Sequence, residues 1–173
     1  EINAGLGEEG DGIDSNGYLV INGGTVYTLA NDRSPDGGLD ADLDILINGG
    51  HVVALGTRND AVSSASGQMY MELSFASTLP AGSVVELADP EGNALLSLTT
   101  EKAAQSLTFS SPELDQDTVY TLTVDGVVQQ YSGNMAGGFG GMGGHGGGLP
   151  PSGGQQPPEM QPGGQRPEGG EQP

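Results

Sequence analysis

The stretch GDGIDSNGYLVINGGTVYTLA, Gly10 to Ala30, decides the fold, because a near copy follows it as GGLDADLDILINGGHVVALG, Gly37 to Gly56. We call these stretches the first and the second repeat. They align without a gap at the spacing from Ile13 to Leu39, which we call the repeat offset. The matched pairs are Ile13 with Leu39, Asp14 with Asp40, Asn16 with Asp42, Leu19 with Ile45, Ile21 with Ile47, Val26 with Val52 and Leu29 with Leu55. An internal repeat of this kind indicates a fold built from stacked copies of one unit.

Each repeat has the residue pattern of β-strands around a corner. Apolar residues recur at period two in the second repeat and are expected to face inward: Leu39, Ala41, Leu43, Ile45 and Ile47. Each run ends in Asn-Gly-Gly, which suits a corner because Gly and Asn accept positive φ. A short second strand follows, at 26–29 and 52–55. The repeats therefore predict coils of a parallel β-helix, with a pair of β-hairpins in a sandwich as the alternative.

Stacking would place aspartates of successive coils in columns. Equivalent residues of neighbouring parallel strands lie about 4.8 Å apart, so Asp14 is expected over Asp40 and Asn16 over Asp42. Two unit charges at that distance repel by about 1 kcal/mol in water and about 3 kcal/mol at an effective dielectric near 20. A divalent cation would remove this repulsion, and calcium prefers carboxylate oxygens. The candidate calcium ligands are Asp11, Asp14, Asp40, Asp42 and Asp44; the alternative is a solvated acidic face.

The rest of the chain divides into two further zones. Residues 63–131 hold short β-type runs, at 69–75, 83–87, 94–98, 106–109, 119–124 and 127–128. Asp125-Gly126 predicts a hairpin turn between the last two runs. We expect a small antiparallel β-sandwich that caps the terminal β-helix coils of residues 1–62. Residues 132–173 are a low-complexity tail rich in Gly, Pro and Gln, which is expected to be flexible or polyproline-like.

Composition limits the partners that this protein can have. Four Lys and Arg stand against 23 Asp and Glu, a formal charge of −19, so nucleic acid is not expected as a partner. No apolar run approaches the roughly 20 residues of a membrane helix, so membrane insertion is not expected either. There is no Cys to form a disulfide or a thiolate metal site. The start, Glu1-Ile2-Asn3, has no initiator Met and no signal-peptide pattern, so we expect a piece of a longer protein.

These residues resemble a known family, the secreted bacterial carbohydrate-binding β-helix proteins that bind polygalacturonate and cellulose. The resemblance lies in the two repeats, in the small β-domain that follows and in the ending GGFGGMGGHGGG (137–148), which runs into Pro and Gln. It covers essentially the whole chain and implies a right-handed parallel β-helix of pectate-lyase type. It also implies an exported protein, extracellular or on the bacterial cell surface, that binds acidic plant polysaccharide with calcium. This chain departs from the family in carrying only the last coils.

Three functions remain open on this basis. The first is a non-catalytic module that binds polysaccharide with calcium, for which Tyr18, Asn16 and Arg33 are the candidate sugar contacts. The second is a structural subunit of a fibre or surface assembly, a homopolymer joined through coil edges. The third is a pectate-lyase-like enzyme, which would need an Arg or Lys base beside calcium. Arg33 has an alternative role as a surface ion pair with Asp32 or Asp36, and we see no catalytic constellation, so we expect no enzyme.

Overall fold

The computed structural model describes residues 2–4, 10–35, 37–129 and 132–136. These residues form strands joined by turns and bends, so they offer no helix that could cross a membrane. The strands are β1 (Ile2–Asn3), β2 (Ile13–Ser15), β3 (Leu19–Leu29), β4 (Leu39–Ala41), β5 (Ile45–Gly56), β6 (Tyr70–Leu79), β7 (Val84–Ala88), β8 (Ala94–Thr99), β9 (Ala104–Ser110), β10 (Thr121–Val124), β11 (Val127–Val128) and β12 (Ser132–Ala136).

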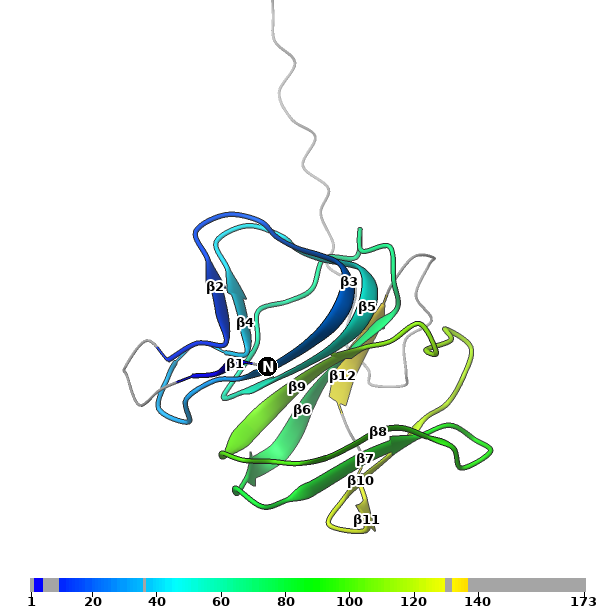
Figure 1. Cartoon of the computed structure of the whole chain (residues 1–173). Helices are drawn as coiled ribbons and strands as arrows, with labels where there is room; N and C mark the ends of the chain where they lie inside the picture. Colours follow the sequence, from blue (N-terminus) through cyan, green and yellow to red (C-terminus); the bar gives the residue numbers. More distant parts are fainter. Residues whose placement is uncertain (1, 5–9, 36, 130–131, 137–173) are drawn as a thin grey trace, which may run out of the picture.

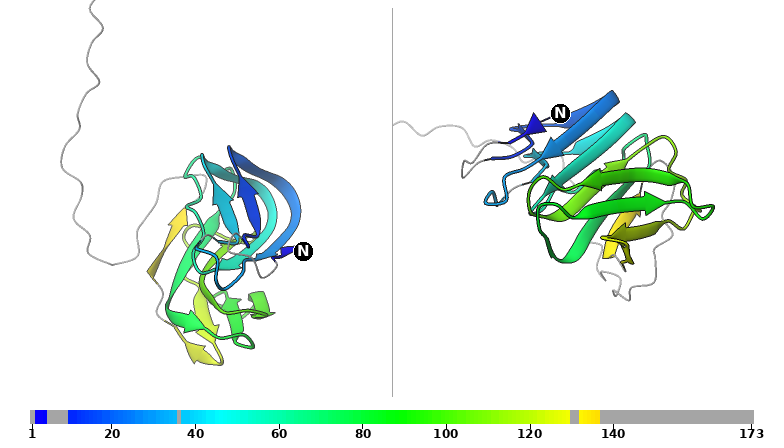
Figure 2. Two further views of the ribbon diagram at one scale, coloured as in Figure 1. Left: turned by 90° about the vertical axis from the view of Figure 1, so that its left-hand side faces the viewer. Right: turned by 60° about the horizontal axis from the view of Figure 1, so that its bottom comes forward.

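The strands form three sheets in an all-β fold. The large sheet has the order β1-β3-β5-β9-β6-β12, the cap sheet has the order β11-β10-β7-β8, and the short sheet pairs β2 with β4. In Figures 1 and 2 the short sheet faces the curved strands β3 and β5. The cap sheet lies across the part of the large sheet that β9 and β6 form.

The two repeats lie side by side in parallel, as the sequence alignment predicts. In the short sheet Ile13, Asp14 and Ser15 pair with the residues one repeat offset later. In the large sheet β3 pairs with β5 from Leu19 opposite Ile45 to Leu29 opposite Leu55. The hairpin alternative is therefore wrong for this part of the chain, because a hairpin would pair its strands antiparallel.

The Asn-Gly-Gly corner bends each strand without ending it. β3 and β5 run through their corners, and the pairing register shifts locally there before it returns to the repeat offset. Gly24 and Gly50 take φ values of 87° and 97°, the left-handed region that glycine enters at little cost. The chain thereby turns while its ladder to the neighbouring repeat continues on both sides of the corner.

One residue that was predicted to face inward does not do so. Leu43 was expected to continue the apolar face of the second repeat, but its side chain is 57% exposed. The chain bends at residues 42 and 43, between β4 and β5, so the period-two alternation does not hold across that point. The predicted single strand from Leu39 to Ile47 is two strands with an exposed bend between them.

A short segment closes the second repeat on the side away from the first. We call residues 59–68 the closing segment. The Asp60 and Ser63 amides donate to the carbonyl oxygens of Leu39 and Ile45, at 2.9 and 2.8 Å. The Ile47 amide donates to Ser66 Oγ at 3.0 Å. The closing segment thus satisfies backbone groups at the edge of β4 and of the first half of β5.

The cap strands appear close to their predicted positions, and β6 to β11 each overlap a predicted run. Asp125 and Gly126, with φ values of 50° and 76°, form the predicted tight turn between β10 and β11. The cap is joined to the repeats through backbone pairing, because β9 runs antiparallel to β5. The large sheet is consequently mixed and crosses the predicted boundary at residue 62. β12 lies within the predicted tail at 132–173, whose residues from 137 onward are outside the described ones.

Two apolar cores hold these layers together. One fills the space between the short sheet and the inner face of β3 and β5, with Leu39, Ile45, Ile47 and Val52 fully buried. The other lies between the large sheet and the cap sheet, around Met71, Leu107 and Leu122. The repeats and the cap therefore each bury their own interior, and they share the large sheet.

Candidate functional site

Six of the predicted site residues lie in β2, in β4 and in the connections from these strands to β3 and β5, and we call them the acidic ladder: Asp14, Asn16, Tyr18, Asp40, Asp42 and Asp44. Asp14 pairs directly with Asp40 in the short sheet. The bends that follow β2 and β4 also lie side by side, because the Asp42 amide donates to the Ser15 carbonyl oxygen at 2.9 Å. The Leu19 amide donates to the Asp44 carbonyl oxygen at 3.1 Å. The structure therefore brings the second repeat's three aspartates beside the first repeat's Asp14, Asn16 and Tyr18.

The acidic ladder is open to solvent. Asp14, Asn16, Asp42 and Asp44 are exposed and Asp40 is half-buried. Tyr18 is 62% exposed, so most of its ring is available for contact with another molecule. Exposed large apolar or aromatic groups that line a polar face are common at carbohydrate and protein contacts. A ligand can approach the acidic ladder without a rearrangement of the chain.

Two predicted site residues lie elsewhere. Asp11 precedes β2. Its Oδ1 accepts a hydrogen bond from Ser34 Oγ at 2.6 Å, so its side chain is held against the connection that follows β3. Arg33 is exposed in that same connection, where its amide donates to Asn31 Oδ1 at 3.2 Å. Asp36, one of its alternative ion-pair partners, lies outside the described residues. Neither Asp11 nor Arg33 belongs to the acidic ladder.

The donor chemistry of the acidic ladder fits calcium, which takes six to eight oxygen ligands. It supplies four carboxylates and the side-chain oxygen of Asn16. Among the described residues no three of the His, Asp and Glu side chains already converge as a metal cluster. The acidic ladder could therefore supply part of a coordination shell, and the remaining oxygens would come from water and from the ligand itself.

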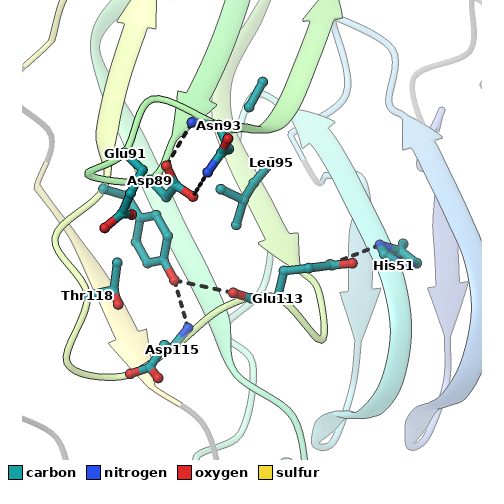
Figure 3. Close-up of a pocket in the computed structure, with 10 residues that line it drawn as sticks. His51, Asp89, Glu91, Asn93, Leu95, Glu113, Asp115 and Thr118 are labelled. Carbon is teal, nitrogen blue, oxygen red and sulfur yellow. Dashed lines mark hydrogen bonds and ion pairs between the residues drawn. The ribbon is translucent and has the colours of Figure 1, made fainter.

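A pocket on the cap side was not predicted from the sequence. It has a volume of about 380 Å³ and lies where the turn after β7 approaches the loop between β9 and β10 (Figure 3). Its lining residues are His51, Asp89, Glu91, Asn93, Ala94, Leu95, Glu113, Asp115, Thr118 and Tyr120. The sequence marks Asp89 to Asn93 as a turn, but nothing in it shows that this turn faces the loop after β9.

Several polar groups of this pocket form hydrogen bonds within the loops that surround it. Hydrogen bonds from the Asn93 side chain lower the pKa of Asp89, whose carboxylate also accepts from the Asn93 amide at 2.7 Å. The buried Tyr120 hydroxyl accepts from the Asp115 amide at 2.7 Å and reaches the Glu113 carbonyl oxygen (Figure 3). These contacts order the two loops that form the pocket.

His51, Ser111 and Glu113 meet at one edge of this pocket without forming a catalytic relay. His51 Nδ1 lies 3.4 Å from Ser111 Oγ and 3.8 Å from Glu113 Oε2, and Ser111 Oγ also donates to Glu113. A serine relay needs the hydroxyl on one ring nitrogen and the acid on the other. Here both partners lie on the same nitrogen, so the histidine cannot pass a proton between them.

Comparison with known proteins adds no assignment: no family model, no curated protein and no solved structure matches this chain.

Proposed function

We propose that this chain is the terminal part of a right-handed parallel β-helix that binds acidic polysaccharide, such as polygalacturonate, through calcium held on the acidic ladder. The observation that carries the proposal is the direct pairing of Asp14 with Asp40 in parallel strands, which places two carboxylate residues side by side. The resemblance to secreted bacterial polygalacturonate- and cellulose-binding proteins supports it. The protein acts outside the cell or at its surface and does so without catalysis.

Calcium is needed because both partners are anions. The protein carries a formal charge of −19, so an acidic polysaccharide is repelled unless cations lie between the two. Asp14, Asp40, Asp42 and Asp44 would hold calcium from the protein side, and carboxylates of the polysaccharide would complete its shell. Bound calcium supplies positive charge at the interface and removes the repulsion within the ladder.

The two non-acidic residues of the acidic ladder, Tyr18 and Asn16, would contact the sugar rings themselves. Tyr18 offers an exposed aromatic face on which a sugar ring can stack. Asn16, two residues earlier in the chain, is also exposed and can both donate to and accept from sugar hydroxyls. Arg33 lies in the connection after β3, outside this surface, and does not take part in the proposed contact.

The test measures polygalacturonate binding by calorimetry with calcium and again after chelation. We expect binding in calcium that disappears in the chelator. The double variant Asp14→Asn/Asp40→Asn should weaken it at least about tenfold, because two of the four carboxylate charges of the acidic ladder are removed. The matched control is Glu91→Gln/Asp117→Asn, which removes the same charge from exposed residues of the cap. It should bind polygalacturonate like the unaltered protein.

Other outcomes would reassign the protein. Binding that persists in the chelator would overturn the calcium role, and equal losses in both double variants would reduce the effect to net charge. Cellulose binding that is independent of calcium would make the ligand a neutral glucan. Growth of ultraviolet absorbance on polygalacturonate would reveal the unsaturated product of a lyase and would contradict a non-catalytic role.

A further inference from the structure

Three asparagines of the described chain stand directly before a glycine: Asn16, Asn22 and Asn48. In such a pair the backbone nitrogen of the glycine can attack the side-chain carbonyl carbon of the asparagine, because glycine has no side chain to obstruct the approach. Asparagine is a thermolabile residue in proteins. All three side chains are exposed, so exposure does not separate them. Their hydrogen bonds and their places in the fold do.

Asn22 and Asn48 are held inside the strands β3 and β5. Asn48 Oδ1 accepts the Gly67 amide at 3.0 Å, and Asn48 Nδ2 donates to Asn22 Oδ1 at 2.9 Å. A Cβ built on Gly49 would lie 2.9 Å from the Asn22 carbonyl oxygen, so there is little room beside that glycine. The two strands also pair with each other on both sides of the corner. Either asparagine would have to break some of these contacts before its side chain could turn toward the next backbone nitrogen.

Asn16 lacks these restraints. It lies with Gly17 in the bend between β2 and β3. Among the described residues, neither the Asn16 side chain nor the Gly17 amide has a hydrogen-bond partner. The Leu43 amide donates to the Gly17 carbonyl oxygen at 3.1 Å, a contact that holds the bend without using the Gly17 nitrogen. A Cβ on Gly17 would meet nothing within 4 Å, so the bend has space for a ring to form.

The second repeat already carries aspartate at the equivalent position. Asp42 stands one repeat offset after Asn16. The two backbones lie side by side here, because the Asp42 amide donates to the Ser15 carbonyl oxygen at 2.9 Å. A carboxylate at position 16 would therefore lie in the same relation to Asp42 as Asp14 does to Asp40. The bend accepts an aspartate at this point, since the second repeat places one there.

We propose that Asn16-Gly17 is a site of spontaneous deamidation, which converts Asn16 to aspartate or isoaspartate and adds a further carboxylate to the acidic ladder. The Gly17 nitrogen loses its proton and bonds to Asn16 Cγ, the Cγ–Nδ2 bond breaks, and ammonia leaves. Water then opens the ring, at Cγ to give aspartate or at the backbone carbonyl carbon to give isoaspartate. The carboxylates of Asp14 and Asp42 oppose the loss of the proton, but they are exposed and screened by water and salt. The modification does not depend on the proposed function, whereas its effect on calcium rests on it.

The test follows the three asparagines in the full chain during incubation in mildly alkaline buffer. Peptide mapping by mass spectrometry measures each conversion, and an isoaspartate methyltransferase detects the isoaspartate product. We expect Asn16 to convert at least about tenfold faster than Asn22 or Asn48, because only the latter two must first open a strand. Equal rates in the folded protein, or a faster rate at Asn22, would overturn the proposal.

Two controls separate the fold from the local chemistry. In concentrated urea the three rates should approach one another, since each asparagine then precedes a glycine in an unfolded chain; rates that stay apart would contradict the structural cause. Gly17→Ala adds a methyl group that obstructs the attack but meets nothing in the folded protein. Conversion of Asn16 should fall at least about tenfold in this variant, with the melting temperature unchanged. An unchanged rate would contradict ring closure at this bend.

Asn16→Asp gives a stable form of the aspartate product and tests its effect on the acidic ladder. Calorimetry should show calcium binding at least about threefold tighter than in the unaltered protein, because calcium affinity follows the number of carboxylate ligands. Gln105→Glu adds the same charge at an exposed position of β9 and should leave the affinity unchanged. Equal tightening in both variants would reduce the effect to net charge and contradict the link to the acidic ladder. If neither the unaltered protein nor Asn16→Asp binds calcium, the proposed function fails while the measured deamidation stands.

Discussion

Gly49 and Gly23 occupy the same position in successive repeats but have different surroundings. A side chain on Gly49 would collide with the Asn22 backbone, whereas the space beside Gly23 is open among the described residues. The need for glycine at this position therefore arises from the neighbouring repeat, since both residues lie in the same corner sequence.

Gly49→Ala should destabilise the protein, and Gly23→Ala serves as its matched control. We expect a loss of about 1–3 kcal/mol for Gly49→Ala, because the methyl group forces two backbones apart. Gly23→Ala should be neutral or stabilising by up to about 1 kcal/mol, through the unfolded chain. Urea denaturation gives both free energies of unfolding. Equal losses would show that the corner conformation, and not stacking, requires glycine.

Glu72 is the titratable residue that joins the closing segment to the large sheet. Its carboxylate accepts the Val62 amide at 2.7 Å. Burial raises the pKa of Glu72 above its ordinary value of 4.5, and the Val62 hydrogen bond opposes part of that shift. The folded protein therefore holds this proton more tightly than the unfolded chain does. Stability contributed by the neutral form is lost as pH rises through the raised pKa.

Glu72→Gln should remove that pH dependence and keep the acceptor for the Val62 amide. The free energy of unfolding of the variant should equal that of the unaltered protein near pH 4 and exceed it near pH 7. The measurement is a series of urea midpoints across that range. Glu91→Gln, at an exposed glutamate, should follow the unaltered protein throughout. If the free energy of unfolding of Glu72→Gln falls relative to that of the unaltered protein as pH rises, the folded state favours the ionised Glu72 carboxylate.

At the level of elements, the closing segment depends on one buried hydroxyl. Ser66 is 2% exposed, and its Oγ accepts the amide of the fully buried Ile47. Ser66→Ala leaves that amide without an acceptor and should cost about 1–3 kcal/mol. Ser64→Ala, at a nearby exposed position, should change the free energy of unfolding by less than about 0.5 kcal/mol. Equal effects in chemical denaturation would show that water replaces the lost contact.

The repeat predicted the pairing of β2 with β4 and of β3 with β5 because stacked copies place equivalent residues side by side. The closing segment lacks that signal. Its Val62 bridges Ile45, while the Gln68 amide donates to the Ile47 carbonyl oxygen, and these two pairs have different sequence spacings. No constant offset relates it to the second repeat. Its contacts also rely on side-chain oxygens, such as Ser66 Oγ, that a pattern of apolar residues does not reveal.

The repeat also predicts only part of the candidate site. The acidic ladder follows from the repeat, since Asp14 and Asp40 are equivalent positions. Asp11 and Arg33 fall outside it because the connection after β3 has its own hydrogen bonds, among them Ser34 to Asp11. The cap pocket was missed because its walls come from His51 and from two loops far apart in the sequence. Only the sheet order brings those segments together.

For the whole molecule, the formal charge of −19 opposes the compact state. Raising sodium chloride from about 10 to about 500 mM should raise the melting temperature, because the screening length falls from about 30 Å to about 4 Å. Calorimetry at matched ionic strength then separates calcium from screening. Calcium should give a further rise that Asp14→Asn/Asp40→Asn removes and Glu91→Gln/Asp117→Asn retains. A melting temperature that does not respond to sodium chloride would contradict the role of self-repulsion.

The antiparallel pairing of β5 with β9 limits where further repeats can be inserted into this chain. Every residue of β5 from Val52 to Gly56 pairs with β9, so a duplicated unit inserted between these strands would have to break all of those pairs. Duplication before β2 leaves every β5–β9 pair in place and displaces only the two pairs of β1 with Thr28 and Leu29. Insertions as long as the repeat offset, or whole multiples of it, keep the aspartate columns and the asparagine corners aligned. An insertion of any other length would have to bulge out of the stack. We therefore expect tolerated insertions to be as long as the repeat offset or a whole multiple of it.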